Sequence, residues 1–313
     1  MSVEYAIIVK NKTRLESLIE RFNTKEQAKF YIERLGGDFD DYILEHEVFL
    51  EALSSLQSQL SKTLKHKIVE RKYLPSFLFS DKNVIVVIGQ DGLVANTAKY
   101  SKGIPIIAVN SDKKRYDGVL LPFEINNFMI GVEAVIQNQF QSKKMRFAEV
   151  KLNDGQKLLA FNDLFIGASS HISARYKITF NKKMEEQSSS GIIVSTLAGS
   201  TGWLSSIFNM ANGVSGFQTK KNKSTKTKFK DSELLFVVRE PFESVRTKTE
   251  IGIGLINQNQ NLTIESLMPS NGVIFSDGIE TDFLNFNSGT IANISLSKEF
   301  ATLVLNDSLN TTT

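Results

Sequence analysis

One acidic residue in the first half of the chain stands where an α/β protein can hold a phosphate group. An uninterrupted apolar run at 83–88 is followed by Gly89, Gln90, Asp91 and Gly92, and a helical pattern continues to about residue 100. Such a run is typical of a central parallel strand covered on both faces. Free N–H groups at the start of the next helix bind phosphate, and glycines allow its close approach. A tight turn in which Asp91 caps the helix is the other interpretation.

Two polar segments in the second half of the chain could contact a ligand in a similar way. A strand-like run at 191–195 leads into a turn rich in Gly, Ser and Thr, and Trp203 and a helical pattern follow. The turn offers N–H groups at a helix start, although a helix capped by Ser or Thr explains it as well. Earlier, Asn162 and Asp163 interrupt an apolar strand, where polar side chains usually have a defined hydrogen-bonding partner. A bulge or a strand end at a sheet edge is the alternative.

The elements that must position these segments divide the chain into two expected domains. Residues 1–145 alternate strand-like runs, at 5–9, 67–70, 83–88 and 105–109, with helical stretches, the longest at 14–61 with a break at Gly36 and Gly37. This alternation predicts an α/β domain with a parallel sheet.

The pattern of residues 146–300 predicts a mostly β, sandwich-like domain, with a hairpin turn at 153–155 near its beginning. Its expected strands are 147–152, 157–166, 172–180, 191–195, 234–238, 250–256 and 272–275, with one helix at roughly 200–210. Residues 301–313 are expected to be a C-terminal strand and a disordered tail.

The composition excludes several classes of protein. The 313 residues include no cysteine, which rules out disulfides and thiolate chemistry. The three histidines, His46, His66 and His171, are far apart, so we predict no protein metal site. With a net charge of +3, the lysine-rich stretch 219–230 is interpreted as a solvated loop and not as a nucleic-acid arm. We find no leader pattern and no apolar run of about 20 residues, so a cytoplasmic protein without a membrane partner is expected.

Taken in order, the three polar segments resemble the motifs of the NAD kinase family. That family carries Gly-Gly-Asp-Gly after a strand, Asn-Glu in a strand of the second domain, and a later segment rich in Gly, Ser and Thr. Further stretches are similar to the mitochondrial-type branch, in which a Trp also ends the Gly-Ser segment: 7–14, 109–112, 118–122, 189–191 and 238–241. The segment 275–278 resembles the Asp-Gly pair that the family has near its last strands.

The resemblance implies an NAD kinase-like two-domain fold and an ATP-dependent enzyme. The γ-phosphate of ATP, with Mg²⁺, would pass to the 2′-hydroxyl of the adenosine ribose of NAD to make NADP, and Asp91 would be the catalytic carboxylate. The implied NAD-binding residues are Asp91, Gly92, Phe123, Asn162, Asp163, Ser190, Thr201, Gly202 and Trp203. The implied ATP and phosphate contacts are Gly89, Gln90, Gly92, Gly199 and Ser200. A homodimer or homotetramer is also implied.

Three positions depart from the family pattern. Gln90 replaces a glycine, which would strain the backbone by about 1–2 kcal/mol if that position required a positive φ. Leu93 replaces Thr, and Asp163 replaces Glu with a side chain that is one methylene shorter. A second hypothesis is therefore a catalytically weak NAD-binding sensor that has lost its handling of the phosphate donor at Gln90 and Leu93. A kinase for another hydroxyl acceptor is a third, because the Gly-Asp-Gly loop recurs in lipid and sugar kinases.

Overall fold

The computed structural model describes residues 3–219 and 228–306, and the chain divides into two compact units. Unit 1 comprises Met1–Lys144 and Ala301–Thr313, and unit 2 comprises Met145–Phe300. Two strands, β6 (Ser142–Leu152) and β17 (Ile291–Val304), begin in one unit and end in the other. Most of the lysine-rich stretch and the expected tail lie outside the described residues.

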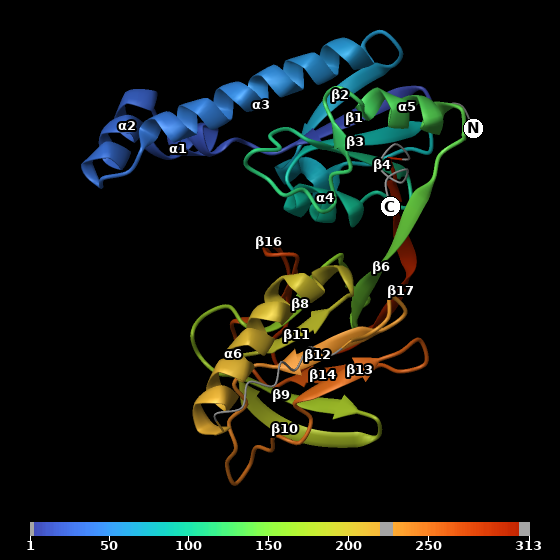
Figure 1. Cartoon of the computed structure of the whole chain (residues 1–313). Coiled ribbons are helices and arrows are strands. Elements are labelled where there is room, and N and C mark those ends of the chain that lie inside the picture. The colour runs from blue at the N-terminus through green and yellow to red at the C-terminus, as the bar shows by residue number, and fades with distance from the viewer. Residues whose placement is uncertain (1–2, 220–227, 307–313) are drawn as a thin grey trace. The chain divides into compact units, whose positions relative to one another are not determined.

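Unit 1 is built around a parallel sheet (Figure 1). In spatial order its strands are β2 (Lys65–Glu70), β1 (Tyr5–Lys10), β3 (Asn83–Gly89), β4 (Pro105–Asn110) and the short β5 (Phe123–Glu124). The end of β17 also pairs in parallel with the beginning of β4. Every residue of β3 is buried, as expected for an apolar run in the middle of a covered sheet. The predicted parallel α/β sheet is confirmed.

Helices cover this sheet and position its loops. α3 (Phe39–Leu60) and α5 (Phe128–Ile136) share one apolar core with alternate residues of β1, β3 and β4. α4 (Asp91–Ala98) follows β3 directly, and a 3₁₀ turn, Arg71–Ser76, follows β2. α5 was not predicted, because a helix that is apolar on nearly every side gives no periodic signal. No helix in the described part of the chain is long and apolar enough to cross a membrane.

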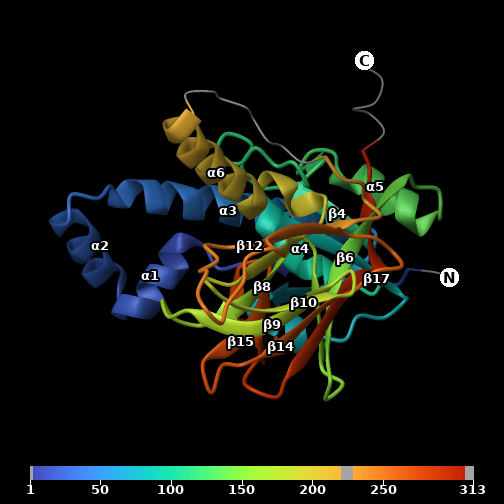
Figure 2. The same cartoon turned by 90° about the horizontal axis from the view of Figure 1, so that it is seen from below.

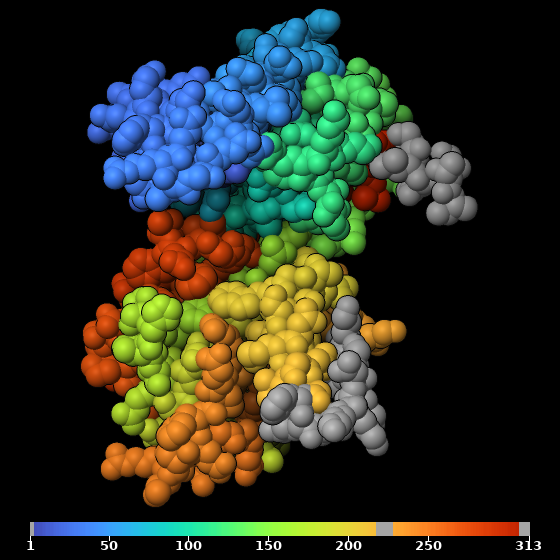
Figure 3. Space-filling model, turned by 60° about the vertical axis from the view of Figure 1, so that its left-hand side comes forward, coloured from blue at the N-terminus to red at the C-terminus, as the bar shows by residue number. Residues whose placement is uncertain are grey.

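The polar stretch at 14–61 forms three helices, α1 (Arg14–Phe22), α2 (Lys25–Arg34) and α3, where we predicted a single break. The missed break lies at Asn23, which ends α1 with φ 66°, and at Thr24, whose side chain accepts the Gln27 N–H at the start of α2. Figures 1 and 2 show α1 and α2 beside the N-terminal end of α3, to the side of the sheet. In the space-filling view these helices form one blue lobe of unit 1 (Figure 3).

Unit 2 consists of antiparallel strands in two layers. In one layer the strand order is β10 (Lys183–Ser189), β9 (Ala174–Phe180), β14 (Leu262–Ser266) and β17, and β6 and β7 (Lys157–Ala160) lie beside β17. In the other layer the order is β13 (Ile253–Ile256), β12 (Leu234–Val238), β11 (Ile192–Ser195), β8 (Asp163–Ala168), β15 (Gly272–Ser276) and β16 (Ile279–Asn285). Alternate residues of both layers meet in one core, which confirms the predicted β-rich, sandwich-like part of the chain.

Several predictions for unit 2 were wrong in detail. The single strand expected at 157–166 is two strands, β7 and β8, separated at Phe161 and Asn162. The helix expected at 200–210 is α6 (Trp203–Thr219), preceded by a 3₁₀ turn, Ala198–Thr201. β10, β14, β16 and the first part of β17 were missed, because their polar, half-exposed residues resemble loop sequence. α6 covers the outer face of the second layer through Leu204 and Ile207.

Candidate functional site

Asp91 is the first residue of α4, at the carboxyl end of β3. Gly89, with φ +147°, makes the turn out of the strand. The Asp91 carboxylate does not cap its own helix: Oδ2 accepts the N–H of Val119 at 3.2 Å, and Oδ1 accepts the N–H of Leu120 at 2.7 Å. The carboxylate therefore faces a neighbouring loop, and the interpretation of Asp91 as a helix cap was wrong.

Gln90 lies in ordinary extended backbone, with φ −112° and ψ 162°. The position does not require a positive φ, so the strain considered for this substitution is absent. The exposed Gln90 side chain hydrogen-bonds the Tyr116 phenol, whose pKa is raised mainly by burial while this bond acts in the opposite direction. Leu93 is buried beneath the loop, where a Cβ on Gly89 would lie 3.4 Å from its Cδ2 atom. Gly92 has open space around its Cα.

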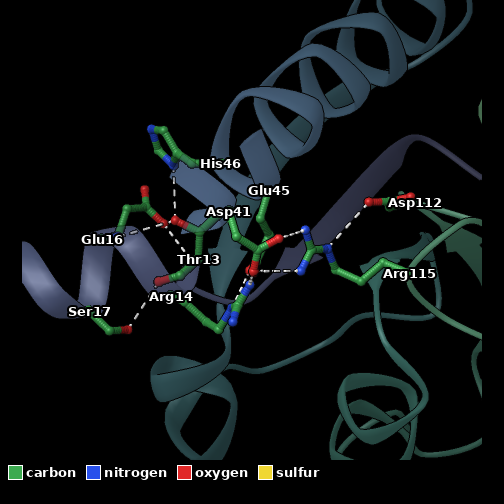
Figure 4. Close-up of polar contacts among 9 residues, drawn as sticks. All are labelled: Thr13, Arg14, Glu16, Ser17, Asp41, Glu45, His46, Asp112 and Arg115. Carbon is green, nitrogen blue, oxygen red and sulfur yellow. Dashed lines mark hydrogen bonds and ion pairs between the residues drawn. The ribbon is translucent and has the colours of Figure 1, made fainter. Parts of the chain in front are cut away.

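Ion pairs tie the loop at 110–120 to the first helices of unit 1 (Figure 4). The Arg115 guanidinium binds both Asp41 carboxylate oxygens, at 2.6 and 3.3 Å, and lies 3.6 Å from Asp112. Arg14 donates to Asp41 at 2.8 Å and also to Glu45. These hydrogen bonds, first from Arg115 and then from Arg14, hold the pKa of Asp41 well below its usual range. The loop that contacts Asp91 is thus anchored to α1 and α3.

Phe123 is placed differently from the other expected residues of unit 1. It lies in β5 and is only 1% exposed. A Cβ on Gly131 of α5 would lie 2.8 Å from the Phe123 ring, so the ring packs closely against that helix within the core. The described surroundings of Phe123 are therefore apolar side chains of unit 1.

In unit 2 the break between β7 and β8 is held from two sides. On one side, the Asp277 carboxylate accepts three consecutive N–H groups, from Phe161 at 3.0 Å, Asn162 at 2.6 Å and Asp163 at 3.3 Å. On the other, the Phe161 carbonyl accepts the Thr196 hydroxyl at 2.6 Å. The Asn162 carbonyl accepts the Thr196 N–H at 2.9 Å. Asn162, Asp163 and the segment after β11 therefore form one hydrogen-bonded assembly.

Asp277 was not among the predicted site residues. Its signal in the sequence was the Asp-Gly pair near the last strands, which carried a resemblance but no role. Its target lies more than 110 residues earlier in the chain, so nothing local indicated the contact.

Asp163 is a largely buried carboxyl group whose pKa is strongly raised. Burial, and secondly the negative charge of Asp277, raise the pKa of Asp163 to about 7. Its Oδ1 atom is buried and has no hydrogen-bond partner in the described part of the chain. A buried, unpaired oxygen of this kind is costly unless a ligand donates to it, and a hydroxyl group is a suitable donor.

The glycine-rich turn packs directly on this assembly. A Cβ on Gly199 would lie 2.4 Å from the Asn162 carbonyl oxygen, so only glycine fits there. The Ser200 hydroxyl donates to the Leu197 carbonyl at 2.7 Å, and Thr201 and Gly202 are exposed. The segment thus presents a polar, exposed edge close to Asn162.

A hollow of about 800 Å³ lies within unit 2 and includes Ser190 and Trp203 in its lining. The Trp203 ring stacks on Phe165 with centroids 5.8 Å apart and planes at 9°, and the Arg239 guanidinium lies 5.4 Å from the Trp203 centroid. Residues 163 and 165 alternate with 164 on β8, so Asp163 and Phe165 share one face of the strand. An aromatic wall with a cation and several hydroxyl groups suits a flat, polar ring system.

The expected residues are thus distributed over both units. Unit 1 carries Gly89, Gln90, Asp91, Gly92 and Phe123. Unit 2 carries Asn162, Asp163, Ser190, Gly199, Ser200, Thr201, Gly202 and Trp203. Among the described residues, no group of three or more His, Asp or Glu side chains could hold a metal ion.

Comparison with known proteins points to one family. No family model matches the chain. The NAD kinase of Clostridium kluyveri is 30% identical over 132 residues, which are 40% of this chain and 45% of that protein. The NAD kinase of Saccharolobus islandicus is 24% identical over 155 residues, which are 49% of this chain and 60% of that protein. The chain therefore spans about half the length of the curated relatives it matches.

Two solved structures match nearly the whole chain. Yeast NADH kinase complexed with NADH has a TM-score of 0.62 at 12% identity and covers 98% of this chain and 84% of its own. An NAD kinase from Archaeoglobus fulgidus in complex with ATP has a TM-score of 0.54 at 14% identity, with 97% and 94% covered. The chain has the two-domain fold of NAD kinases. These relatives support the relationship to the NAD kinase family that the motifs indicated.

Proposed function

We propose that the protein is an ATP-dependent NAD kinase, which transfers the γ-phosphate of ATP to the 2′-hydroxyl of the adenosine ribose of NAD and makes NADP. The observation that carries the proposal is the assembly of Asn162, Asp163 and the Gly199–Trp203 segment, because it offers an unpaired carboxylate oxygen beside an exposed polar edge. The fold shared with kinases solved with NADH and with ATP supports the same assignment.

Unit 2 would recognise the acceptor nucleotide. In the proposal, Asn162 and Asp163 bind ribose hydroxyls, and Thr201, Gly202 and Trp203 lie along the adenosine part. Ser190, which lines the same hollow as Trp203, is assigned to the nicotinamide end by the family resemblance. The ionised form of Asp163 accepts hydroxyl hydrogens best, so acceptor binding should strengthen as the pH rises through about 7.

Asp91 would orient the attacking hydroxyl in the phosphoryl transfer. The Val119 and Leu120 N–H groups fix both of its oxygens, and each oxygen retains a lone pair for a ribose hydroxyl. Phosphoryl transfer passes through a loose transition state, for which alignment and charge neutralisation matter most. Asp91 would accept the hydroxyl proton as the ribose oxygen bonds to the γ-phosphorus, while the bond from that phosphorus to the bridging oxygen breaks and ADP leaves.

The donor would be held near the start of α4. Gly89, Gln90 and Gly92 belong to the turn there, and the first N–H groups of a helix bind phosphate. Gly199 and Ser200 are the corresponding proposed contacts in unit 2. Mg²⁺ would enter on the phosphates of ATP and would neutralise their charge during transfer.

The test is NADP formation by the purified protein with NAD, ATP and Mg²⁺, coupled to an NADP-specific dehydrogenase, with Asp91→Asn beside it. We expect turnover in the wild type and its loss in the variant. NAD binding measured by calorimetry, without any NADP formation, would instead support the second hypothesis of a sensor that has lost donor handling.

The relaxed backbone at Gln90 favours the kinase over the sensor, since the substitution leaves the turn unstrained. A crowded phosphate at Gln90 and the missing hydroxyl at Leu93 remain the arguments for the sensor. Membership of the mitochondrial-type branch, a homodimer or homotetramer, and a cytoplasmic location remain predictions from the sequence. Analytical ultracentrifugation measures the oligomeric state directly.

A further inference from the structure

Asp277 occupies the turn of the hairpin between β15 and β16. Ser276 pairs with Ile279, which leaves Asp277 and Gly278 as a two-residue loop, and both have positive φ, 53° and 70°. These angles fit a type I′ turn, for which Asn-Gly and Asp-Gly are the preferred sequences. The turn itself therefore accepts Asn as readily as Asp, and it does not account for a carboxylate at this position.

The carboxylate instead binds the segment that separates β7 from β8. It accepts the N–H groups of Phe161, Asn162 and Asp163, and the Asp277 N–H donates to the Asp163 carbonyl at 3.0 Å. A neutral side chain could not accept all three N–H groups equally well, because an amide has one oxygen where a carboxylate has two. Hydrogen bonds from N–H groups to a charged acceptor are stronger than neutral ones.

The opposite side of the break is held separately by Thr196, through the Phe161 and Asn162 carbonyls. All three N–H groups and both of these carbonyls therefore already have hydrogen-bond partners. The side chains of Asn162 and Asp163 are left for a ligand, and the buried Asp163 Oδ1 has no partner in the described chain. Asp277 thus binds the N–H groups of residues 161–163, whereas Thr196 binds carbonyls of the same segment.

We propose that Asp277 is a positioning residue for the acceptor site, whose carboxylate fixes the Phe161–Asp163 backbone so that Asn162 and Asp163 together bind a vicinal diol such as a ribose. The identity of the diol rests on the proposed function, whereas the positioning role rests on the contacts alone. Asp277 touches no substrate in this account and acts through its neighbours.

The charge of Asp277 gives the role a signature that simple packing lacks. Asp277 is the charged group whose field acts on Asp163 in the described part of the chain, and it raises the pKa of that carboxyl in addition to burial. A neutral residue at 277 should therefore lower the Asp163 midpoint, because a like charge would be removed. Structural damage that exposes Asp163 to water would also lower the midpoint, so the variant Asp277→Glu, which keeps the charge, separates the two causes.

The experiment compares the wild type with Asp277→Asn, Asp277→Glu and the control Asp231→Asn. Asp231 is an exposed carboxylate of unit 2, so its variant removes an equal charge away from the site. The Asp163 carboxyl is titrated by ¹³C NMR in the ligand-free proteins, and hydrogen exchange is measured at the amides of residues 161–163. NAD binding is measured by calorimetry at pH 6 and pH 8.

We expect Asp277→Asn to fold, to lower the Asp163 midpoint by at least half a pH unit, to speed exchange at the three amides and to weaken NAD binding about tenfold. Asp277→Glu should loosen the amides and keep a raised midpoint. An unchanged midpoint and unchanged exchange in Asp277→Asn would overturn the inference. If the wild type binds no NAD, the proposed function fails, yet the NMR arm still decides the role of Asp277.

Discussion

Two aspartates are given roles in the proposed function, one in each unit, and the two units hold them by different physical means. Asp91 in unit 1 is held by a loop, and that loop is anchored by ion pairs of Arg14, Asp41 and Arg115, which are a quarter to nearly half exposed, and of the buried Glu45. Asp163 in unit 2 is held by backbone hydrogen bonds within a largely buried assembly. Exposed ion pairs are screened by salt, whereas burial penalises charge. Unit 1 should therefore respond to ionic strength, and unit 2 to pH.

The difference also suits the two proposed tasks. In the proposed function Asp91 orients a hydroxyl during transfer, and each of its two carboxylate oxygens accepts an N–H group of the neighbouring loop. A buried oxygen without a partner favours ribose binding by a carboxylate. A ribose hydroxyl that donates to this oxygen removes the free-energy cost of leaving it unpaired. In the proposed function, the same residue type would thus supply catalysis in one unit and recognition in the other.

The largest expected effect separates these tasks directly. Asp91→Asn should lower kcat by about 10²–10⁴-fold with little change in NAD affinity, because the charge, the proton acceptor and one of the two N–H contacts to the loop are lost. Asp163→Asn should chiefly raise the KM for NAD. Steady-state kinetics with both nucleotides checks the split, and calorimetry confirms binding by each variant. Equal loss of kcat in both variants would mean that the two carboxylates do not divide the work in this way.

The next effect concerns the packing of the glycine-rich turn on Asn162. Gly199→Ala should destabilise the protein by about 1–3 kcal/mol, because a Cβ would lie 2.4 Å from a backbone oxygen that the assembly holds in place. Gly213→Ala is the matched control, since that glycine lies inside α6 with open space around its Cα. It should stabilise by up to about 1 kcal/mol through helix propensity. Urea unfolding measures both values, and destabilisation of similar size at the two positions would rule out the proposed tight packing.

A third effect is the dependence of stability on pH. Asp163 keeps its proton up to about pH 7 in the folded protein, whereas an unfolded Asp loses it near pH 3.9. The folded state therefore binds more protons between these values, so this residue makes stability fall as the pH rises from about 4 to 7 and level off above. The change between pH 5 and pH 7 should be about 1–3 kcal/mol. For Asp163→Asn, urea unfolding should show no such fall in the free energy of unfolding between pH 5 and pH 7. The same dependence on pH in variant and wild type would contradict this role of Asp163.

Much of this comparison could be anticipated from the sequence. The apolar run at 83–88 identified β3, and Asp91 was correctly predicted to stand where a helix follows it. Asn162 and Asp163 were recognised as an interruption, although the strand break itself was only one alternative. Local pattern sufficed here because strands, turns and helix starts are set by neighbours in the chain.

The partners of these residues could not be anticipated in the same way. Asp91 contacts Val119 and Leu120, 28 and 29 residues later, and Asp277 reaches back 114 to 116 residues. Such contacts depend on how elements pack in three dimensions, which local propensity does not encode. The backbone of Gln90 is a further case, because a residue's type does not reveal whether its position needs a positive φ.

The smallest expected effect tests the anchor of the Asp91 loop. Arg115→Gln removes the bidentate pair with Asp41 and the contact with Asp112, so the loop should loosen and turnover should fall about two- to fivefold at low salt. Arg115 is 25% and Asp41 40% exposed, and ion pairs this accessible to solvent contribute about 0–1 kcal/mol, so stability should change little. Lys113→Gln is the control, because that lysine pairs with Glu124 at a more exposed position of the same loop. Raising the salt to about 1 M, where the screening length is near 3 Å, should lower wild-type turnover toward the Arg115→Gln value and leave the variant almost unchanged. If salt affects wild type and variant equally, the ion pairs do not hold Asp91, and hydrogen bonds within the loop, such as that from the Asn110 amide to the Tyr116 carbonyl, fix its two N–H donors.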